Sequence, residues 1–134
     1  MASRSAARRG RLSRSSEFER VYRDGRSSAN RHLVLYSFPN PAVERPRLGL
    51  SVSRKVGGAV ERNRVKRLLR EAFHGIEGEL GGGQDVVVVA RPPVSGLAER
   101  EGLAGVGSAL GELVDRAGLR RTAAAESRAG GKRE

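Results

Sequence analysis

Apolar residues recur along the chain in spacings that predict three β-strands. Segment 31–38 is rich in leucine, valine and aromatic residues, and segment 47–53 alternates leucine or valine with glycine and serine, which is typical of strands buried on one face. Segment 85–90 contains an unbroken run of valines, which is typical of a strand covered on both faces. The first two strands are separated by a loop of several residues that contains Pro39 and Pro41, so we predict that they pair as an antiparallel hairpin.

Three further segments have the spacing of helices. A capping box, in which Ser16 and Glu19 satisfy free backbone donors, begins a short helix over 16–24. A second helix starts near residue 60 and ends before the glycines at 81–83, and a third spans 97–119. Their apolar faces are Phe18, Val21 and Tyr22 in the first, Val65, Leu68, Leu69, Ala72, Phe73 and Ile76 in the second, and Leu103, Val106, Leu110, Leu113 and Val114 in the third.

The order of these elements predicts the fold class. A helix between two strands favours a strand-helix-strand unit in a mixed sheet, and 134 residues suit one small domain. We therefore expect a single α+β domain over residues 12–119. Segments 1–11 and 120–134 are rich in small and charged residues without an apolar period, so we expect a disordered basic arm and a disordered tail.

The composition excludes several classes of protein. The chain has no cysteine, which excludes disulfides, thiolate metal sites and cysteine nucleophiles. Its longest apolar run, residues 86–90, is far shorter than a membrane span, and no apolar core of a secretion signal follows the first arginines. We therefore expect a cytoplasmic protein that does not span a membrane.

Positive charge is concentrated in the first half of the chain. The whole chain carries 26 Lys and Arg against 15 Asp and Glu, a net charge of +11. Residues 1–74 have 18 bases and 6 acids, whereas residues 75–134 have 8 bases and 9 acids. Such asymmetry favours a polyanionic partner, either a nucleic acid or an anionic membrane surface. The alternative, a charged surface that only keeps the chain in solution, carries the cost of strong self-repulsion.

The densest part of this charge lies on the predicted middle helix. Arg62, Lys66 and Arg70 are four residues apart and form one stripe, where like charges repel by about 0.2–0.5 kcal/mol per pair. A helix that tolerates this repulsion is expected to meet phosphates. Glu61 and Glu71 could instead pair with these cations and leave an ordinary solvated face, but two acids cannot balance the helix's five bases.

A glycine turn at residues 57–58 precedes this helix and frees backbone N–H groups next to Arg54 and Lys55. Donors at the start of a helix favour a phosphate group. The Lys-Ser or Lys-Thr pair of a nucleotide-binding phosphate loop is missing, so we do not expect ATP hydrolysis.

The titratable residues suggest no catalytic centre. His32 and His74 have no metal-ligand spacing, and the acids are scattered singly rather than in the pairs of a two-metal nuclease. We therefore expect an RNA- or DNA-binding protein with no catalytic residue, no metal ligand and no small-molecule substrate. Its few aromatic residues could stack unpaired bases or pack in the core. They are Phe18, Tyr22, Tyr36, Phe38 and Phe73.

Segment 62–73, Arg-Asn-Arg-Val-Lys-Arg-Leu-Leu-Arg-Glu-Ala-Phe, resembles the basic signature helix of the bacterial ribonuclease P protein component. Further blocks match in the same order, so that the resemblance covers residues 12–119; they are 18–22, 28–31, 47–55 and 90–93. The resemblance implies an α/β sandwich-like domain with a mixed four-stranded sheet, in which the basic helix lies in an unusual left-handed βαβ crossover. The fourth strand follows from the resemblance alone.

The resemblance also implies a function. In this family a partner RNA performs the magnesium-dependent hydrolysis that removes the 5′ leader from precursor tRNA, and Mg²⁺ is bound mainly by that RNA. The protein binds the catalytic RNA and the leader and helps metal ions bind. By this resemblance the RNA contacts are Arg54, Lys55, Arg62, Asn63, Arg64, Lys66, Arg67 and Arg70. The leader would lie in a cleft lined by Phe18, Tyr22 and Tyr36.

Two other functions stay open at this point. A structural RNA-binding protein of the ribosomal type would share the basic charge but needs no cleft for a leader. A protein nuclease that acts alone would need a cluster of carboxylates, which the scattered acids oppose.

Overall fold

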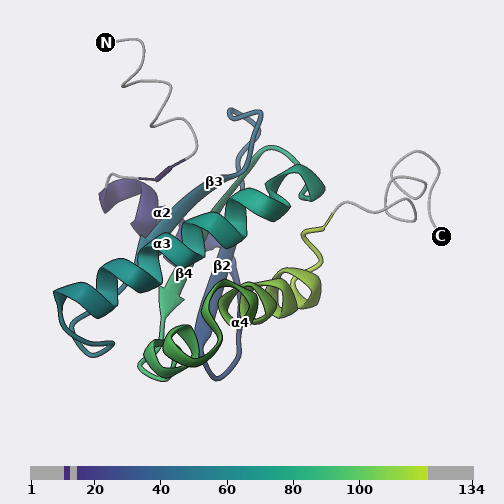
Figure 1. Ribbon diagram of the computed structural model, residues 1–134. Helices are drawn as coiled ribbons and strands as arrows, with labels where there is room; N and C mark the ends of the chain where they lie inside the picture. Colours follow the sequence, from purple (N-terminus) through teal and green to yellow (C-terminus); the bar gives the residue numbers. More distant parts are fainter. Residues whose placement is uncertain (1–10, 13–14, 121–134) are drawn as a thin grey trace, which may run out of the picture.

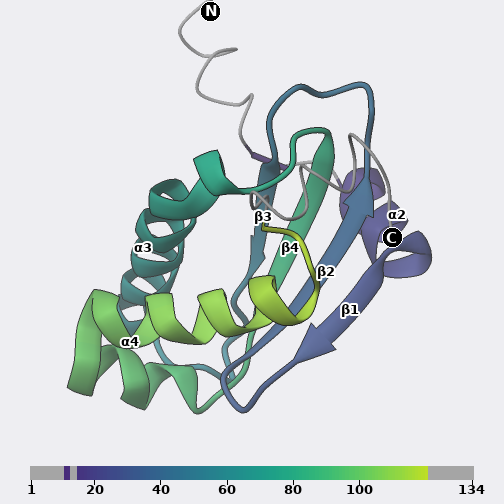
Figure 2. The same cartoon turned by 90° about the vertical axis from the view of Figure 1, so that its right-hand side faces the viewer.

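The sheet of this protein, shown from two directions in Figure 1 and Figure 2, has four strands in the order β1-β2-β4-β3. The computed structural model describes residues 11–12 and 15–120. Its strands are β1 Arg26–Ala29, β2 Leu33–Pro39, β3 Arg47–Ser51 and β4 Gln84–Ala90. Its helices are α2 Ser15–Asp24, α3 Ala59–Ile76 and α4 Val94–Arg116, and a short 3-10 helix, η1 Glu77–Glu79, follows α3. The described residues thus form the predicted small α+β domain with a mixed sheet.

The central strand of the sheet is β4. It pairs antiparallel with β2 on one side and parallel with β3 on the other. The predicted hairpin between segments 31–38 and 47–53 is therefore wrong, because β2 and β3 both border β4 and the loop between them crosses the end of β4 (Figure 2). The valine run explains this order: Val86, Val87 and Val88 are fully buried, and such a strand is most stable where both of its faces are covered.

The fourth strand is β1, which pairs antiparallel with β2 at one edge of the sheet. Its sequence, Arg-Ser-Ser-Ala, has no apolar alternation, and its side chains are mostly exposed. This strand was expected from the family resemblance only, and the structure confirms it.

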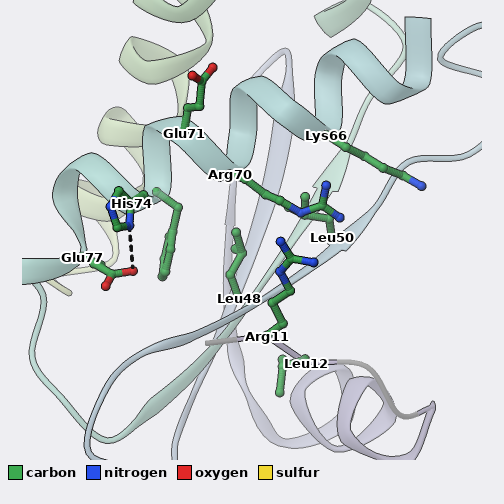
Figure 3. Close-up of a pocket in the computed structure, with 10 residues that line it drawn as sticks. Arg11, Leu12, Leu48, Leu50, Lys66, Arg70, Glu71, His74 and Glu77 are labelled. Atoms are coloured by element: carbon green, nitrogen blue, oxygen red, sulfur yellow. Dashed lines mark ion pairs between the residues drawn. The ribbon is translucent and has the colours of Figure 1, made fainter. Parts of the chain in front are cut away.

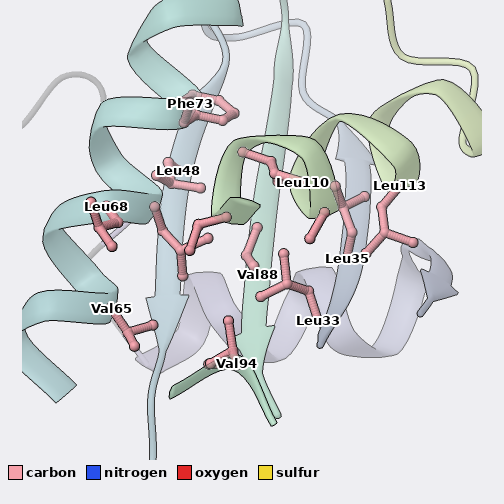
Figure 4. Close-up of a cluster of buried hydrophobic side chains, with 14 of the residues drawn as sticks. Leu33, Leu35, Leu48, Val65, Leu68, Phe73, Val88, Val94, Leu110 and Leu113 are labelled. Atoms are coloured by element: carbon pink, nitrogen blue, oxygen red, sulfur yellow. The ribbon is translucent and has the colours of Figure 1, made fainter. Parts of the chain in front are cut away.

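The helices cover the two faces of the sheet unequally. The main core lies between the sheet and the pair α3 and α4 (Figure 4). It contains Leu33 and Leu35 from β2, Leu48 from β3, Val88 from β4, Val65, Leu69 and Phe73 from α3, and Leu110 and Leu113 from α4. On the opposite face the ten-residue α2 packs over a smaller cluster built on Leu12, Val21 and Val87. One face is therefore fully covered, and the other only in part.

The basic helix α3 connects the parallel neighbours β3 and β4 through a left-handed crossover. Figure 2 views the sheet from the face that carries α4, with β3 and β4 both running downward and β4 to the right of β3. Because α3 packs on this same face, the connection has the hand opposite to that of almost all βαβ units. This feature was implied by the resemblance and is present.

The predicted helix boundaries are close to those observed. The last helix begins at Val94 rather than 97 and ends at Arg116, and it bends at Gly102, whose φ is 57°. The predicted arm and tail lie outside the described residues except for Arg11 and Arg120, which form isolated β-bridges with Leu48 and Leu80. In the described part of the chain, no helix is long and apolar enough to cross a membrane.

Candidate nucleic-acid interface

Helix α3 has one apolar face and a broad basic surface. It buries Val65, Leu68, Leu69 and Phe73 against the main core. The cations of the predicted RNA-binding set therefore lie on the sides that remain in contact with solvent. Arg62, Arg64 and Lys66 are half-buried, while Asn63, Arg67 and Arg70 on α3, and Arg54 and Lys55 before it, are exposed.

These cations have no acidic partners in the described part of the chain. Among residues 11–12 and 15–120, the ion pairs include none of the seven Lys and Arg side chains of the predicted set. The pairs with Glu61 and Glu71 that would have left a neutralised solvated face do not form. The positive potential of α3 is therefore available to an external anion.

A groove separates α3 from the free edge of β3 and gathers part of this charge (Figure 3). Its volume is about 460 Å³, and Leu48 and Leu50 of β3 form its apolar floor. Lys66 and Arg70 line it from α3, and the side chain of Arg11, which is bridged to β3, points toward that of Arg70. Burial and the positive charge of Arg11 lower the pKa of Arg70. Glu71 and Glu77 also line the groove, away from the point where Arg11, Lys66 and Arg70 converge. Like charges that converge in this way form a surface suited to a phosphate.

Arg11 was missed by the sequence prediction. It belongs to the segment that was expected to be a disordered arm, and nothing in its spacing relates it to α3. The backbone of Leu12 donates a hydrogen bond to the carbonyl of Leu48 at 2.9 Å, so this segment adds to the edge of β3. Such an edge pairing cannot be inferred from one residue of the added strand.

The residues predicted to line the leader cleft lie on the other face of the sheet, beside α2. The rings of Phe18 and Tyr22, one turn apart on α2, have centroids 6.3 Å apart, and Tyr22 meets Tyr36 of β2 edge-on at 4.9 Å. Burial and the neighbouring Tyr36 raise the pKa of Tyr22, and the nearby side chain of Ser51 opposes this shift. The structure thus brings the three predicted cleft residues together.

A strip of the sheet next to α2 remains partly exposed. Ser51, Val89 and Val34 are neighbours across β3, β4 and β2, and all three are half-exposed. Tyr22 beside them is 39% exposed, whereas Phe73 is 3% exposed in the main core. Of the two roles left open for the aromatic residues, Phe73 packs in the core, and the group around Tyr22 keeps ring surface in contact with solvent.

Strand β3 borders both surfaces. Its residues Leu48 and Leu50 face the groove under α3, whereas Ser51 contacts Tyr22 in the cleft. The exposed Arg54 and Lys55 follow directly after this strand. A nucleic acid could therefore contact α3 and the cleft at the same time.

Comparisons with known proteins agree with this arrangement. A family model described as Ribonuclease P matches residues 6–117. The ribonuclease P protein component of Shouchella clausii is 50% identical over 91 residues, which are 68% of this chain and 75% of that protein. The solved RNase P protein of Staphylococcus aureus is 32% identical with a TM-score of 0.76, over 84% of this chain and 98% of that one. That of Thermotoga maritima is 34% identical with a TM-score of 0.71, over 79% and 96%. With its basic α3 in the left-handed crossover and its sequence matched almost from end to end of the domain, the chain belongs to the ribonuclease P protein family.

Proposed function

We propose that this component of ribonuclease P, a tRNA-processing endonuclease, binds the catalytic RNA through α3 and the 5′ leader of precursor tRNA in the cleft beside α2. The RNA performs the hydrolysis, and the protein increases the affinity for the precursor in the cytoplasm. One observation carries this proposal. Within residues 11–12 and 15–120, the cations of the basic helix have no acidic partners, and this helix and a half-exposed aromatic group lie on either side of the same strand, β3.

The basic set is suited to the phosphates of a folded RNA. Each Lys or Arg that meets a phosphate releases a counterion, so several such contacts supply a large, salt-dependent part of the affinity. The contacts we assign to the RNA are Arg54, Lys55, Arg62, Asn63, Arg64, Lys66, Arg67 and Arg70, and we add Arg11 across the groove.

The cleft is suited to a single strand. Half-exposed rings of Phe18, Tyr22 and Tyr36 offer faces or edges on which unpaired bases can stack, and each stacked base contributes about 1–3 kcal/mol. Ser51 and the tyrosine hydroxyls add donors and acceptors for base edges. Aromatic rings can stack only on bases that are unpaired and accessible, which favours the leader over the paired regions of tRNA.

The chain itself is poorly suited to hold Mg²⁺. In the described part of the chain, no three His, Asp or Glu side chains are grouped as metal ligands would be. A net charge of +11 also repels a divalent cation. We therefore assign the Mg²⁺ of the reaction mainly to the RNA, and the protein's role to binding.

Affinities for precursor tRNA with and without a leader test this function. The full chain is assembled with its matching RNA, and dissociation constants are compared for wild type and Tyr36→Ala. We expect Tyr36→Ala to weaken binding of the precursor more than binding of mature tRNA, whereas equal losses would argue against a leader cleft.

Two activity measurements separate the remaining functions. A structural RNA-binding protein of the ribosomal type would not stimulate leader cleavage by the matching RNA at low magnesium, whereas the proposed component would. Cleavage of precursor tRNA by chain purified free of RNA would show that the protein performs the hydrolysis, against this proposal.

A further inference from the structure

A buried carboxylate connects α2 to the sheet at the end of the cleft. Asp85, which directly precedes the valine run of β4, is fully buried. Its two oxygens accept hydrogen bonds from Arg47 Nε at 2.8 Å and Arg47 Nη2 at 3.0 Å, from Asn40 Nδ2 at 3.0 Å and from Arg20 Nη2 at 3.3 Å. Arg47 also donates from Nη1 to Glu17 at 3.1 Å. Arg20 and Glu17 both belong to α2, so the network ties this helix to β3 and β4.

The network lies on one side of α2 and the cleft aromatics on the other. At about 100° per residue, Glu17 and Arg20 lie on one flank of Val21, and Phe18 and Tyr22 lie on the opposite flank. Val21 is the buried residue of α2 that points to the sheet. Val21 and the half-buried Phe18 hold the middle and one flank of the helix against the sheet, and the other flank is held by the ion pairs. The ion pairs of Glu17 and Arg20 therefore set the angle at which Phe18 and Tyr22 face the cleft.

The charges in this network depend strongly on one another. Burial would raise the pKa of Asp85, but the hydrogen bonds from Arg47 and Asn40 and the charges of Arg47 and Arg20 outweigh it, so the pKa is lowered and the group is an anion. A buried anion needs its partners in place. Because a ten-residue helix is marginal without tertiary contacts, α2 takes its orientation from this site.

We propose that Asp85, through Arg47, Glu17 and Arg20, is a positioning residue for the leader: it fixes the rotation of α2 and thereby the aromatic wall of the cleft. The inference rests on the proposed leader cleft and assigns its geometry to residues that do not line it. Such a residue acts on the precursor through Phe18 and Tyr22 and makes no contact with RNA.

The sign of the charge change makes this inference testable. Asp85→Asn and Glu17→Ala each remove a negative charge, so a purely electrostatic effect would tighten binding of any RNA. If the network positions α2, the same variants weaken the contribution of the leader. Two measurements test whether the variants weaken the contribution of the leader. One is the ratio of the dissociation constants for mature and precursor tRNA, measured with the full chain and its matching RNA.

The other readout is spectroscopic. The chain has two tyrosines and no tryptophan, and both tyrosines, Tyr22 and Tyr36, lie in the cleft. The near-ultraviolet circular dichroism of the folded chain therefore reports on this pair of rings. The control is Val106→Ala, which removes fully buried volume from α4 on the far face and lowers stability without touching α2.

We expect Asp85→Asn, and to a smaller degree Glu17→Ala, to lower the ratio of dissociation constants by about fivefold or more, the lower end of what one stacked base contributes. Both should also change the tyrosine signal under conditions where the chain is fully folded, whereas Val106→Ala should change neither readout. Should Asp85→Asn prove too unstable to fold, Glu17→Ala decides alone. An unchanged ratio and tyrosine signal in the folded variants would overturn the inference. If Tyr36→Ala also leaves the ratio unchanged, the leader cleft itself is wrong.

Discussion

Gly49 of β3 is where the ring of Phe18 approaches the sheet most closely, and Gly49→Ala tests this contact directly. A Cβ at this position would lie 2.7 Å from Phe18 Cζ, 2.9 Å from Phe18 Cε2 and 3.0 Å from Leu12 Cβ. Carbon atoms pack best at about 3.5–4.0 Å, so the ring would have to withdraw by about 1 Å. Gly49 is buried in the sheet and has little freedom to move away.

The size of the effect follows from two opposing contributions. Overpacking by one methyl group costs about 1–3 kcal/mol. Replacement of a strand glycine by alanine returns about 0.5–1 kcal/mol through the lower entropy of the unfolded chain. We therefore expect Gly49→Ala to lower the free energy of unfolding by about 1–2 kcal/mol, and to weaken leader binding because Phe18 shifts.

Urea unfolding of a double-mutant cycle provides the measurement. In a Phe18→Ala background only the contact with Leu12 Cβ at 3.0 Å remains, so Gly49→Ala should then cost much less. Gly75→Ala serves as the matched control, because nothing lies within 4 Å of its added Cβ in α3 and it should raise stability by up to about 1 kcal/mol. Equal costs of Gly49→Ala with and without Phe18 would refute the contact.

Three further predictions concern charge and protonation. Lys66→Ala should weaken RNA binding and reduce the slope of log affinity against log salt by about 0.7–0.9, as for one lost phosphate contact, in a salt titration of the complex. The folded pKa of Asp85 lies below its unfolded value of 3.8, so its stabilisation is present above that pH and is lost as the pH falls through the folded pKa. Urea unfolding between neutral and acid pH should therefore show a smaller decrease in the free energy of unfolding for Asp85→Asn than for wild type. The folded pKa of Tyr22 lies above 10.0, so its contribution to the stability of the fold is present below that pH and is lost as the pH rises through the folded pKa. A pH titration followed by phenolate absorbance should show a step above pH 10.0 that Tyr22→Phe removes.

Much of the fold was predictable where one segment carries its own pattern. The valine run of β4 and the 3.6-residue spacing of α3 depend on neighbours within the same element, and both are confirmed. The partner of β3 was not predictable in this way. A short loop favours a hairpin, but burial of β4 on both faces favours placing it between β2 and β3, and this tertiary effect prevails. β1 could not be predicted from its own sequence, because an exposed edge strand of serine and alanine needs no apolar pattern.

The site was predictable to a similar extent. Spacing along α3 identified its stripe of cations, whereas the set of three aromatic residues followed from the family resemblance. Asp85 looked like the polar start of a strand. Its partners Arg47, Asn40 and Arg20 lie 38, 45 and 65 residues away, and only the folded sheet brings them together. Gly49 is informative only once Phe18 is known to lie above it.

The error about β3 also explains why the two binding surfaces are adjacent. If β3 formed a hairpin with β2, it would lie inside the sheet and have no free edge. The strand after α3, β4, would then not lie between β2 and β3. Because β3 lies beyond β4, one of its edges is free to pair with the segment that contains Arg11. One face of β3 lies under the groove beside α3, and the other faces the aromatic residues of the predicted cleft. The left-handed crossover keeps α3 on the fully covered face and at this edge. The strand order that the local pattern failed to predict is therefore what allows one nucleic acid to meet the basic helix and the aromatic cleft together.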